Sequence, residues 1–178
     1  MIDNGLQHDS TNPATASTTV SASLPKMGDI LGNCRIHSVI GEGSIGIVYK
    51  AFEQDIEVER AIKVLKPNQL GYLREKFQSE GKVTAKLIHP NIVLVHGGGI
   101  YNGSLPFIAM EYINGKSLRA LLEAHNTMHP TVALAMVGVV ASALEYASSK
   151  SFSIWGNHSD KLVHRDLKPE NILVTEEC

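Results

Sequence analysis

The sequence predicts an α+β protein in which a β-rich N-terminal part carries one helix and is followed by a helical part. Short β-branched runs separated by glycine-rich turns fill the chain from Cys34 to about residue 65. A helical stripe of apolar residues follows from about 71 to 88. A second helical stretch, apolar almost all round, runs from Thr131 to about Ser149.

The composition is that of a soluble globular protein. The chain has 178 residues, of which 43% are hydrophobic and 19% charged, and its net charge is −2. Such a charge gives no reason to expect nucleic acid as a partner. Cys34 and Cys178 match no metal or disulfide spacing, so we expect a reducing, cytoplasmic compartment. The apolar stretch from Thr131 to Leu144 is too short to span a bilayer, so no membrane segment is expected.

Residues 1–28 differ in composition from the rest of the chain. They are rich in Ser, Thr, Ala and Asn and contain few large apolar side chains. Such a segment cannot bury enough apolar surface to offset the entropy of ordering, so we expect a disordered tail.

A glycine-rich hairpin opens the β-rich part. Gly41, Gly43 and Gly46 follow the pattern G-x-G-x-x-G-x-V, with Glu42 inside it and Val48 at its end. A dinucleotide-binding fingerprint of this spacing opens a helix, whereas β-branched and aromatic residues follow here. We therefore expect two strands whose glycine-rich turn lets backbone N–H groups approach phosphates. An ordinary flexible hairpin is the alternative.

The next strand and helix supply a lysine and a glutamate. Lys63 lies in the strand 60–65 among apolar neighbours, where a lysine needs an anionic partner or must extend to water. The following helix has one stripe with spacings of 4, 3, 4 and 3, formed by Leu73, Phe77, Glu80, Thr84 and Leu87. This places Glu80 on the core-facing side and predicts a Lys63–Glu80 ion pair. A position at the exposed edge of the stripe is the alternative for Glu80. Gly81 is expected only to weaken the helix.

The middle of the chain alternates between strands and helices. We expect a strand at 92–95, a turn or bulge at Gly97–Gly99, and a strand from Leu105 to Tyr112. Ser117 is expected to cap a short helix. A polar-aromatic insertion with no clear period covers 151–160.

A polar loop follows the apolar helix. Residues 164–171 read HRDLKPEN, and Pro169 within them excludes a regular helix. The apolar runs 162–163 and 172–174 on either side predict two short buried strands that hold the loop.

The side chains of this loop are those that phosphoryl transfer needs. Asp166 can take a proton from a hydroxyl, Lys168 can neutralise a phosphoryl oxygen, and Asn171 can hold a metal. A surface turn with solvated charges is the alternative, but all the fixed positions match one known catalytic loop.

With these residues in hand, the chain resembles eukaryotic-type (Hanks-type) serine/threonine protein kinases and looks most like their bacterial members, over about residues 34–175. Four signals occur in the family's order: the glycine-rich loop, R-A-I-K at 60–63, the helix glutamate and HRDLKPEN. The resemblance implies a protein-kinase-like fold with a complete N-terminal lobe, about 29–113. The helical C-terminal lobe, about 114–178, would be truncated after the catalytic loop.

The resemblance also implies residue roles. Asp166 would orient and deprotonate a substrate hydroxyl, Lys168 would stabilise the moving phosphoryl group, and Asn171 would bind Mg²⁺. The ATP site would comprise the glycine-rich loop, the adenine-sandwiching residues, the phosphate-binding lysine with its glutamate, the gatekeeper and the hinge: Gly41, Glu42, Gly43, Gly46, Val48, Ala61, Leu173, Lys63, Glu80, Met110, and Glu111 to Ile113. The implied reaction transfers the γ-phosphoryl group of ATP to a Ser or Thr hydroxyl of a protein.

The sequence departs from the family in places. Ile45 stands where the loop tip often carries an aromatic residue, and no Asp follows Asp166, so no D-F-G motif is present. We therefore expect the 178-residue chain alone to be weakly active or inactive, and to associate with itself through uncovered apolar surface.

Three functions stay open. They are a serine/threonine kinase represented by a truncated domain, a non-catalytic nucleotide-binding or interaction module, and a small-molecule phosphotransferase. Phosphotransferases of the last class share the fold but usually lack the full HRDLKPEN motif.

Overall fold

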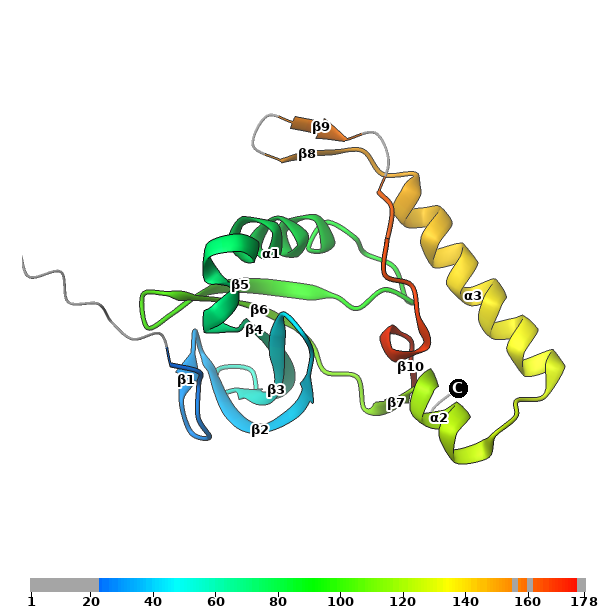
Figure 1. Ribbon diagram of the computed structural model, residues 1–178, viewed down its shortest axis with the longest axis horizontal. Helices are drawn as coiled ribbons and strands as arrows, with labels where there is room; N and C mark the ends of the chain where they lie inside the picture. The colour runs from blue at the N-terminus through cyan, green and yellow to red at the C-terminus, as the bar shows by residue number, and fades with distance from the viewer. Residues whose placement is uncertain (1–22, 155–156, 160–161, 176–178) are drawn as a thin grey trace, which may run out of the picture.

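The computed structural model describes residues 23–154, 157–159 and 162–175. Its main feature is a six-stranded antiparallel sheet with the strand order β1-β2-β3-β4-β6-β5, strongly curved at its β2–β3 end (Figure 1). The strands are β1 (Ile30–Leu31), β2 (Cys34–Glu42), β3 (Gly46–Glu53), β4 (Val58–Leu65), β5 (Val95–Tyr101) and β6 (Leu105–Glu111).

The two faces of the sheet have different tasks, because side chains alternate along each strand. One face supplies a closed apolar core that includes Ile47 and Tyr49 from β3, Ile62 and Val64 from β4, and Phe107 from β6. The opposite face of the same strands carries Val48, Lys63 and Ile108, which are aligned by the β3–β4 and β4–β6 registers.

Helix α1 (Leu70–Thr84) follows a 3₁₀ turn, η1 (Pro67–Gln69), and packs on this second face. Phe77 is its buried anchor, 2% exposed. A Cβ added at Gly81 would lie 2.9 Å from Cδ1 of Ile108, so this glycine permits the close approach of α1 to β6. Gly81 thus has a packing role that the helix propensity scale alone did not predict.

The C-terminal part is smaller and more open. It consists of β7 (Gly115–Ser117), α2 (Leu118–His125), α3 (Pro130–Ser148), β8 (Phe152–Ile154), β9 (Asn157–Ser159), η2 (Pro169–Asn171) and β10 (Leu173–Thr175). The Oγ atom of Ser117 accepts a hydrogen bond from the Ala120 N–H at 3.2 Å, which confirms the predicted cap. Strands β7 and β10 pair and join the start of this part to its end.

Helix α3 stands apart from the sheet (Figure 1), and only Ala143 and Ala147 of its residues are buried. The helix has 19 residues and is longer than the apolar stretch from Thr131 to Leu144 that was judged too short to span a bilayer. Its mean hydropathy is 1.5. By length and composition it is the one helix in the described ranges that could cross a membrane, a criterion that core helices of soluble proteins also meet. It exposes large apolar side chains, notably Leu134 (74%) and Val137 (64%).

Four expectations need correction or adjustment. The predicted tail 1–28 is too long at its C-terminal end, because Leu24 packs against the core and Pro25 is buried, while residues 1–22 lie outside the described part of the chain. Of the two alternatives for Gly97–Gly99, the turn is wrong, because these residues belong to strand β5, whereas a bulge-like register shift lies at their start, between Val95 and Gly97. In the insertion, the described segments pair as the β8–β9 hairpin.

The fourth correction concerns the polar loop. Residues 162 and 163 form no strand, and Leu173 at the start of β10 is 46% exposed. The loop is therefore bounded by a short strand on one side only, and the 3₁₀ turn η2 sets its conformation at residues 169–171.

The glycines of β5 give a matched test of close packing. A Cβ at Gly98 would lie 2.5 Å from the backbone oxygen of Phe107, whereas a Cβ at Gly97 would meet nothing within 4 Å. We expect Gly98→Ala to lower the free energy of unfolding by roughly 1–3 kcal/mol, the usual cost of overpacking. Gly97→Ala is the control and should leave it unchanged or slightly higher. Urea denaturation measures both, and equal effects would contradict this explanation.

Candidate active site

The polar loop brings its three predicted catalytic side chains together. The Nζ atom of Lys168 lies 3.0 Å from Oδ2 of Asp166. The side-chain amide of Asn171 donates to the same Oδ2 at 3.1 Å and to the Asp166 backbone oxygen at 2.8 Å. The turn η2 folds the chain back so that Asn171 reaches Asp166. One carboxylate therefore lies between a cation and an amide.

The backbone before Asp166 is held in an unusual conformation. Arg165 has a φ of 61°, in the left-handed region that non-glycine residues rarely adopt. The Asp166 N–H donates to the backbone oxygen of His164 at 2.8 Å across this residue. Such strain persists only where the surroundings fix it, and it is concentrated at functional sites.

The neighbours of Asp166 keep its side chain ionised. The hydrogen bonds from Lys168 and then Asn171 hold the pKa of this carboxyl below its ordinary value of 3.8. A carboxylate with a lowered pKa is a good acceptor for a hydroxyl hydrogen bond but a weak base. Its chemical capacity is therefore mainly to orient a hydroxyl group.

The polar loop is anchored to helix α2. Arg119 of α2 forms an ion pair with Glu170 at 3.0 Å. The N–H of Leu118 donates to the backbone oxygen of Ile172 at 2.8 Å, which continues the β7–β10 ladder. Neither contact was predicted, because residues this far apart in the sequence give no local signal of their pairing.

The predicted ATP-binding residues fall into adjacent rows across the sheet. Gly41 pairs with Val48, Val48 with Lys63, and in the next row Ala61 pairs with Met110. Val48, Lys63, Ala61 and Met110 therefore share the face that is opposite to the closed core. Leu173 lies on β10 in the C-terminal part, where it pairs with Ser117 of β7 and not with a strand of the six-stranded sheet.

The predicted Lys63–Glu80 ion pair is wrong in this structure. The Glu80 side chain is 50% exposed, and its Oε1 lies 4.0 Å from Nζ of Lys76. The Lys63 Nζ lies 5.9 Å from the ring centroid of Phe77 and has no ion pair among the described residues. The i,i+4 spacing of Lys76 and Glu80 was a signal for this alternative.

The residues of the predicted hinge, Glu111 to Ile113, are hydrogen-bonded to Leu94 at one end and, among the described residues, make no main-chain hydrogen bond at the other. Glu111 exchanges contacts with Leu94: its N–H donates to the Leu94 oxygen at 2.9 Å, and its carboxylate accepts from the Leu94 N–H at 2.6 Å. Within the described part of the chain, the Ile113 main chain makes no hydrogen bond. Its N–H is therefore available to a planar ligand such as adenine.

The residues present fit a magnesium–nucleotide complex in part. The side-chain nitrogen of Asn171 donates its hydrogen bonds to Asp166, which leaves the Oδ1 atom of Asn171 free as an oxygen ligand. No group of three or more His, Cys, Asp or Glu side chains in the described ranges could hold a metal by itself. A metal here depends on the phosphates of its nucleotide for most of its ligands.

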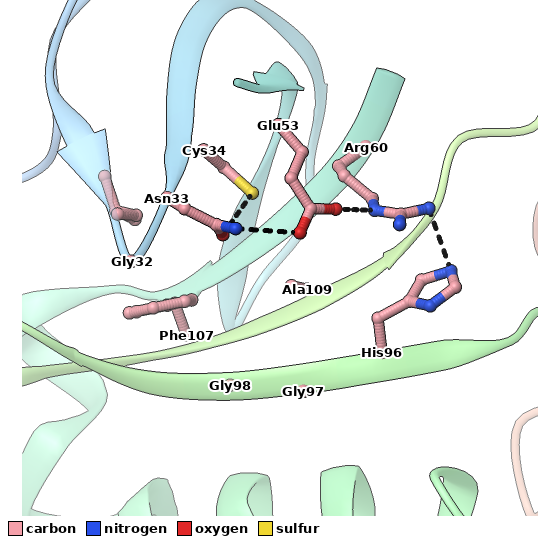
Figure 2. Close-up of a pocket in the computed structure, with 11 residues that line it drawn as sticks. Gly32, Asn33, Cys34, Glu53, Arg60, His96, Gly97, Gly98, Phe107 and Ala109 are labelled. Atoms are coloured by element: carbon pink, nitrogen blue, oxygen red, sulfur yellow. Dashed lines mark hydrogen bonds and ion pairs between the residues drawn. The ribbon is translucent and has the colours of Figure 1, made fainter. Parts of the chain in front are cut away.

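A cavity of about 150 Å³ lies on the other side of the sheet (Figure 2). In it, Glu53 accepts from Arg60 at 2.6 Å and from Asn33 at 2.9 Å, and Arg60 contacts His96 at 3.0 Å. Burial raises the pKa of the Cys34 thiol at its edge. Because none of the predicted site residues lines it, we assign this cavity no part in nucleotide binding.

The ionisation of Asp166 can be tested directly. Lys168→Met should raise the pKa of Asp166, because the largest cause of its lowering is removed, and Lys116→Met should leave it unchanged. Carboxyl carbon NMR titration measures both. The lowered folded-state pKa means that this pair contributes stability above the ordinary aspartate pKa and loses it as the pH falls through the folded-state value. An unchanged Asp166 pKa in Lys168→Met would contradict the observed contact.

Comparisons with known proteins agree with this geometry. The protein kinase domain family matches residues 34–178. The chain is 34% identical over 158 residues to serine/threonine-protein kinase PknD of Mycobacterium tuberculosis, and 37% over 150 residues to PknJ of Mycobacterium bovis. It is 34% identical over 148 residues to PrkC of Bacillus subtilis. These matches cover 88%, 83% and 82% of this chain but only 22%, 23% and 21% of the relatives.

Solved structures give the same result. The Mycobacterium tuberculosis PknI kinase domain superimposes with a TM-score of 0.69 at 29% identity, over 86% of this chain and 59% of that one. A singly substituted variant of the same PknI domain gives a TM-score of 0.68 at 30% identity, over the same shares of the two chains. The chain therefore belongs to the protein kinase domain family, and is of the bacterial Hanks type.

Proposed function

We propose that the chain binds ATP–Mg²⁺ and carries the catalytic loop of a protein kinase that phosphorylates serine or threonine hydroxyls. The observation that supports this most is the Asp166–Lys168–Asn171 cluster, whose distances are 3.0 and 3.1 Å. Relatives named serine/threonine-protein kinases support the choice of substrate class over a small-molecule acceptor. A cytoplasmic location is part of the proposal.

Each residue has a definite task in this proposal. Asp166, which is ionised, accepts a hydrogen bond from the substrate hydroxyl and orients its oxygen toward the phosphoryl group. Lys168 lies close enough to Asp166 to neutralise charge on the transferred group. Lys63, which has no ion pair in the described structure, is available to the phosphates. The bound Mg²⁺ supplies charge neutralisation, and Asn171 Oδ1 is its protein ligand.

The second candidate function, a nucleotide-binding module without catalysis, is favoured by the position of Glu80. In an assay of residues 1–178 alone, Asn171 is the one metal ligand of the family pattern that is present. Glu80 pairs with Lys76 rather than with the phosphate-binding lysine. An assay of residues 1–178 must therefore separate binding from transfer.

We expect residues 1–178 to bind ATP but to transfer phosphate at least about a hundredfold more slowly than an ordinary kinase. The loss of electrostatic stabilisation of this kind has that size. Isothermal titration measures the binding, and radiolabelled transfer to a protein substrate measures the rate. Lys63→Met should weaken ATP binding. Asp166→Asn should leave binding intact and serve as the blank for transfer.

Either of two results would contradict this. Robust, Asp166-dependent transfer would show that the second metal ligand is not needed, and absence of ATP binding would remove the proposed function altogether.

We also propose that the chain associates with itself through α3. Its apolar side chains are exposed over a length that soluble monomers rarely leave uncovered. Leu134→Glu with Val137→Glu should shift the sedimentation profile toward monomer, whereas Tyr72→Glu, at an 88% exposed site on α1, should not. A wild-type chain that sediments as a monomer at high concentration would refute this.

A further inference from the structure

We propose that Lys66 is a positioning residue that holds the glycine-rich turn through Glu42, and thereby sets the affinity for the phosphates of a nucleotide. This inference rests on the proposed function for its ligand. The Lys66 Nζ lies 2.6 Å from Oε1 of Glu42, where the turn begins. The Lys66 N–H donates to the backbone oxygen of Ile45 at 3.0 Å, where the turn ends. One residue therefore contacts both ends of the turn.

The Glu42–Lys66 pair acts from the side away from the phosphate-binding lysine. Glu42 is in register with Ile47, and Ile47 with Val64, both of which are buried in the closed core. Lys66 has an extended backbone two residues after Val64, so it continues that face. Lys63 lies on the opposite face. The pair is thus a tether on the face of the turn opposite to Lys63, and the Glu42 carboxylate is engaged in the ion pair with Lys66.

The turn that this pair holds is tightly packed on β4. The Gly43 N–H donates to the Gly46 oxygen at 2.9 Å, and a Cβ at Gly46 would lie 2.7 Å from the backbone oxygen of Val64. Lys66 is three residues from Lys63 on the same stretch of chain. The tether therefore fixes the turn relative to Lys63. The sequence predicts that the backbone N–H groups of the turn approach the phosphates, and the proposed function gives Lys63 the same ligand.

The expected change in nucleotide affinity follows from how exposed the two side chains of the ion pair are. The Lys66 side chain is 20% exposed and that of Glu42 62%. Pairs of this exposure change an equilibrium by about two- to fivefold, and salt reduces the effect.

Glu42→Gln is the decisive variant, because two explanations predict opposite results. Removal of a negative charge near the phosphates would by itself strengthen ATP binding. Loss of the tether should instead weaken it by about two- to fivefold. Titration of the 178-residue chain with a fluorescent ATP analogue and Mg²⁺ measures this. Adenosine, measured by competition, should bind with unchanged affinity because it has no phosphates.

Three further variants complete the cycle. Lys66→Met should weaken binding of the ATP analogue, and the Glu42→Gln/Lys66→Met double variant should lose no more than the larger single loss. Lys66→Arg should restore binding, and Lys26→Met, at an exposed lysine that precedes β1 and contacts Asp29, should have no effect. Stronger or unchanged analogue binding in Glu42→Gln, or an equal loss of adenosine binding, would overturn the tether.

The tether can be tested even if the proposed function fails. If the wild-type chain does not bind the analogue, the proposed function is wrong, and hydrogen exchange then decides the inference alone. The amides of Gly43 and Lys66 should exchange faster in Glu42→Gln than in the wild type. Equal exchange at both amides would overturn the inference.

Discussion

The antiparallel pairing of β4 with β3 and β6 is the constraint on which the rest of the structure depends. It aligns Val48, Lys63 and Ile108 in one row, so that one face of the sheet presents a lysine and the other a closed core. A slip of one residue in β4 would exchange the faces, burying Lys63 and exposing Ile62 and Val64. The complete burial of these two apolar side chains, both 0% exposed, is what prevents that slip.

Local sequence signals predicted the elements that depend on local chemistry. The glycine hairpin, the Ser117 cap and the long apolar helix were all predicted, because each depends on residues close together in the chain. The grouping of Asp166, Lys168 and Asn171 was implied by the motif and follows from one 3₁₀ turn. The roles of the individual site residues stay predictions.

The failures concern contacts between elements. Glu80 was placed toward the core because its stripe also contains Phe77, but a carboxylate at the edge of a stripe can rotate to water and to Lys76. Gly97–Gly99 were predicted to form a turn or bulge because glycine is common in both, and the register shift between Val95 and Gly97 is the part that was found. The role of Gly98 and Gly99 in the strand is steric, since an added Cβ at either would lie within 3 Å of Phe107. The i,i+4 spacing of Lys76 and Glu80 was a signal for the first contact, whereas no local pattern signals the close approach of Gly98 to Phe107.

The two apolar clusters of the molecule have a thermodynamic consequence. The large cluster draws its buried residues from 31–107, while the second centres on Leu87 and Ala147 and joins the end of α1 to the end of α3. They share no residue, and α1, which packs on the sheet and contributes Val83 to the second cluster, connects them. Loss of the second cluster would remove the contact between α1 and α3 but would leave the residues of the large cluster in place. The second cluster has two buried residues and the large cluster has ten, so we expect the C-terminal part, which carries the predicted catalytic loop, to open at a lower free energy than the sheet.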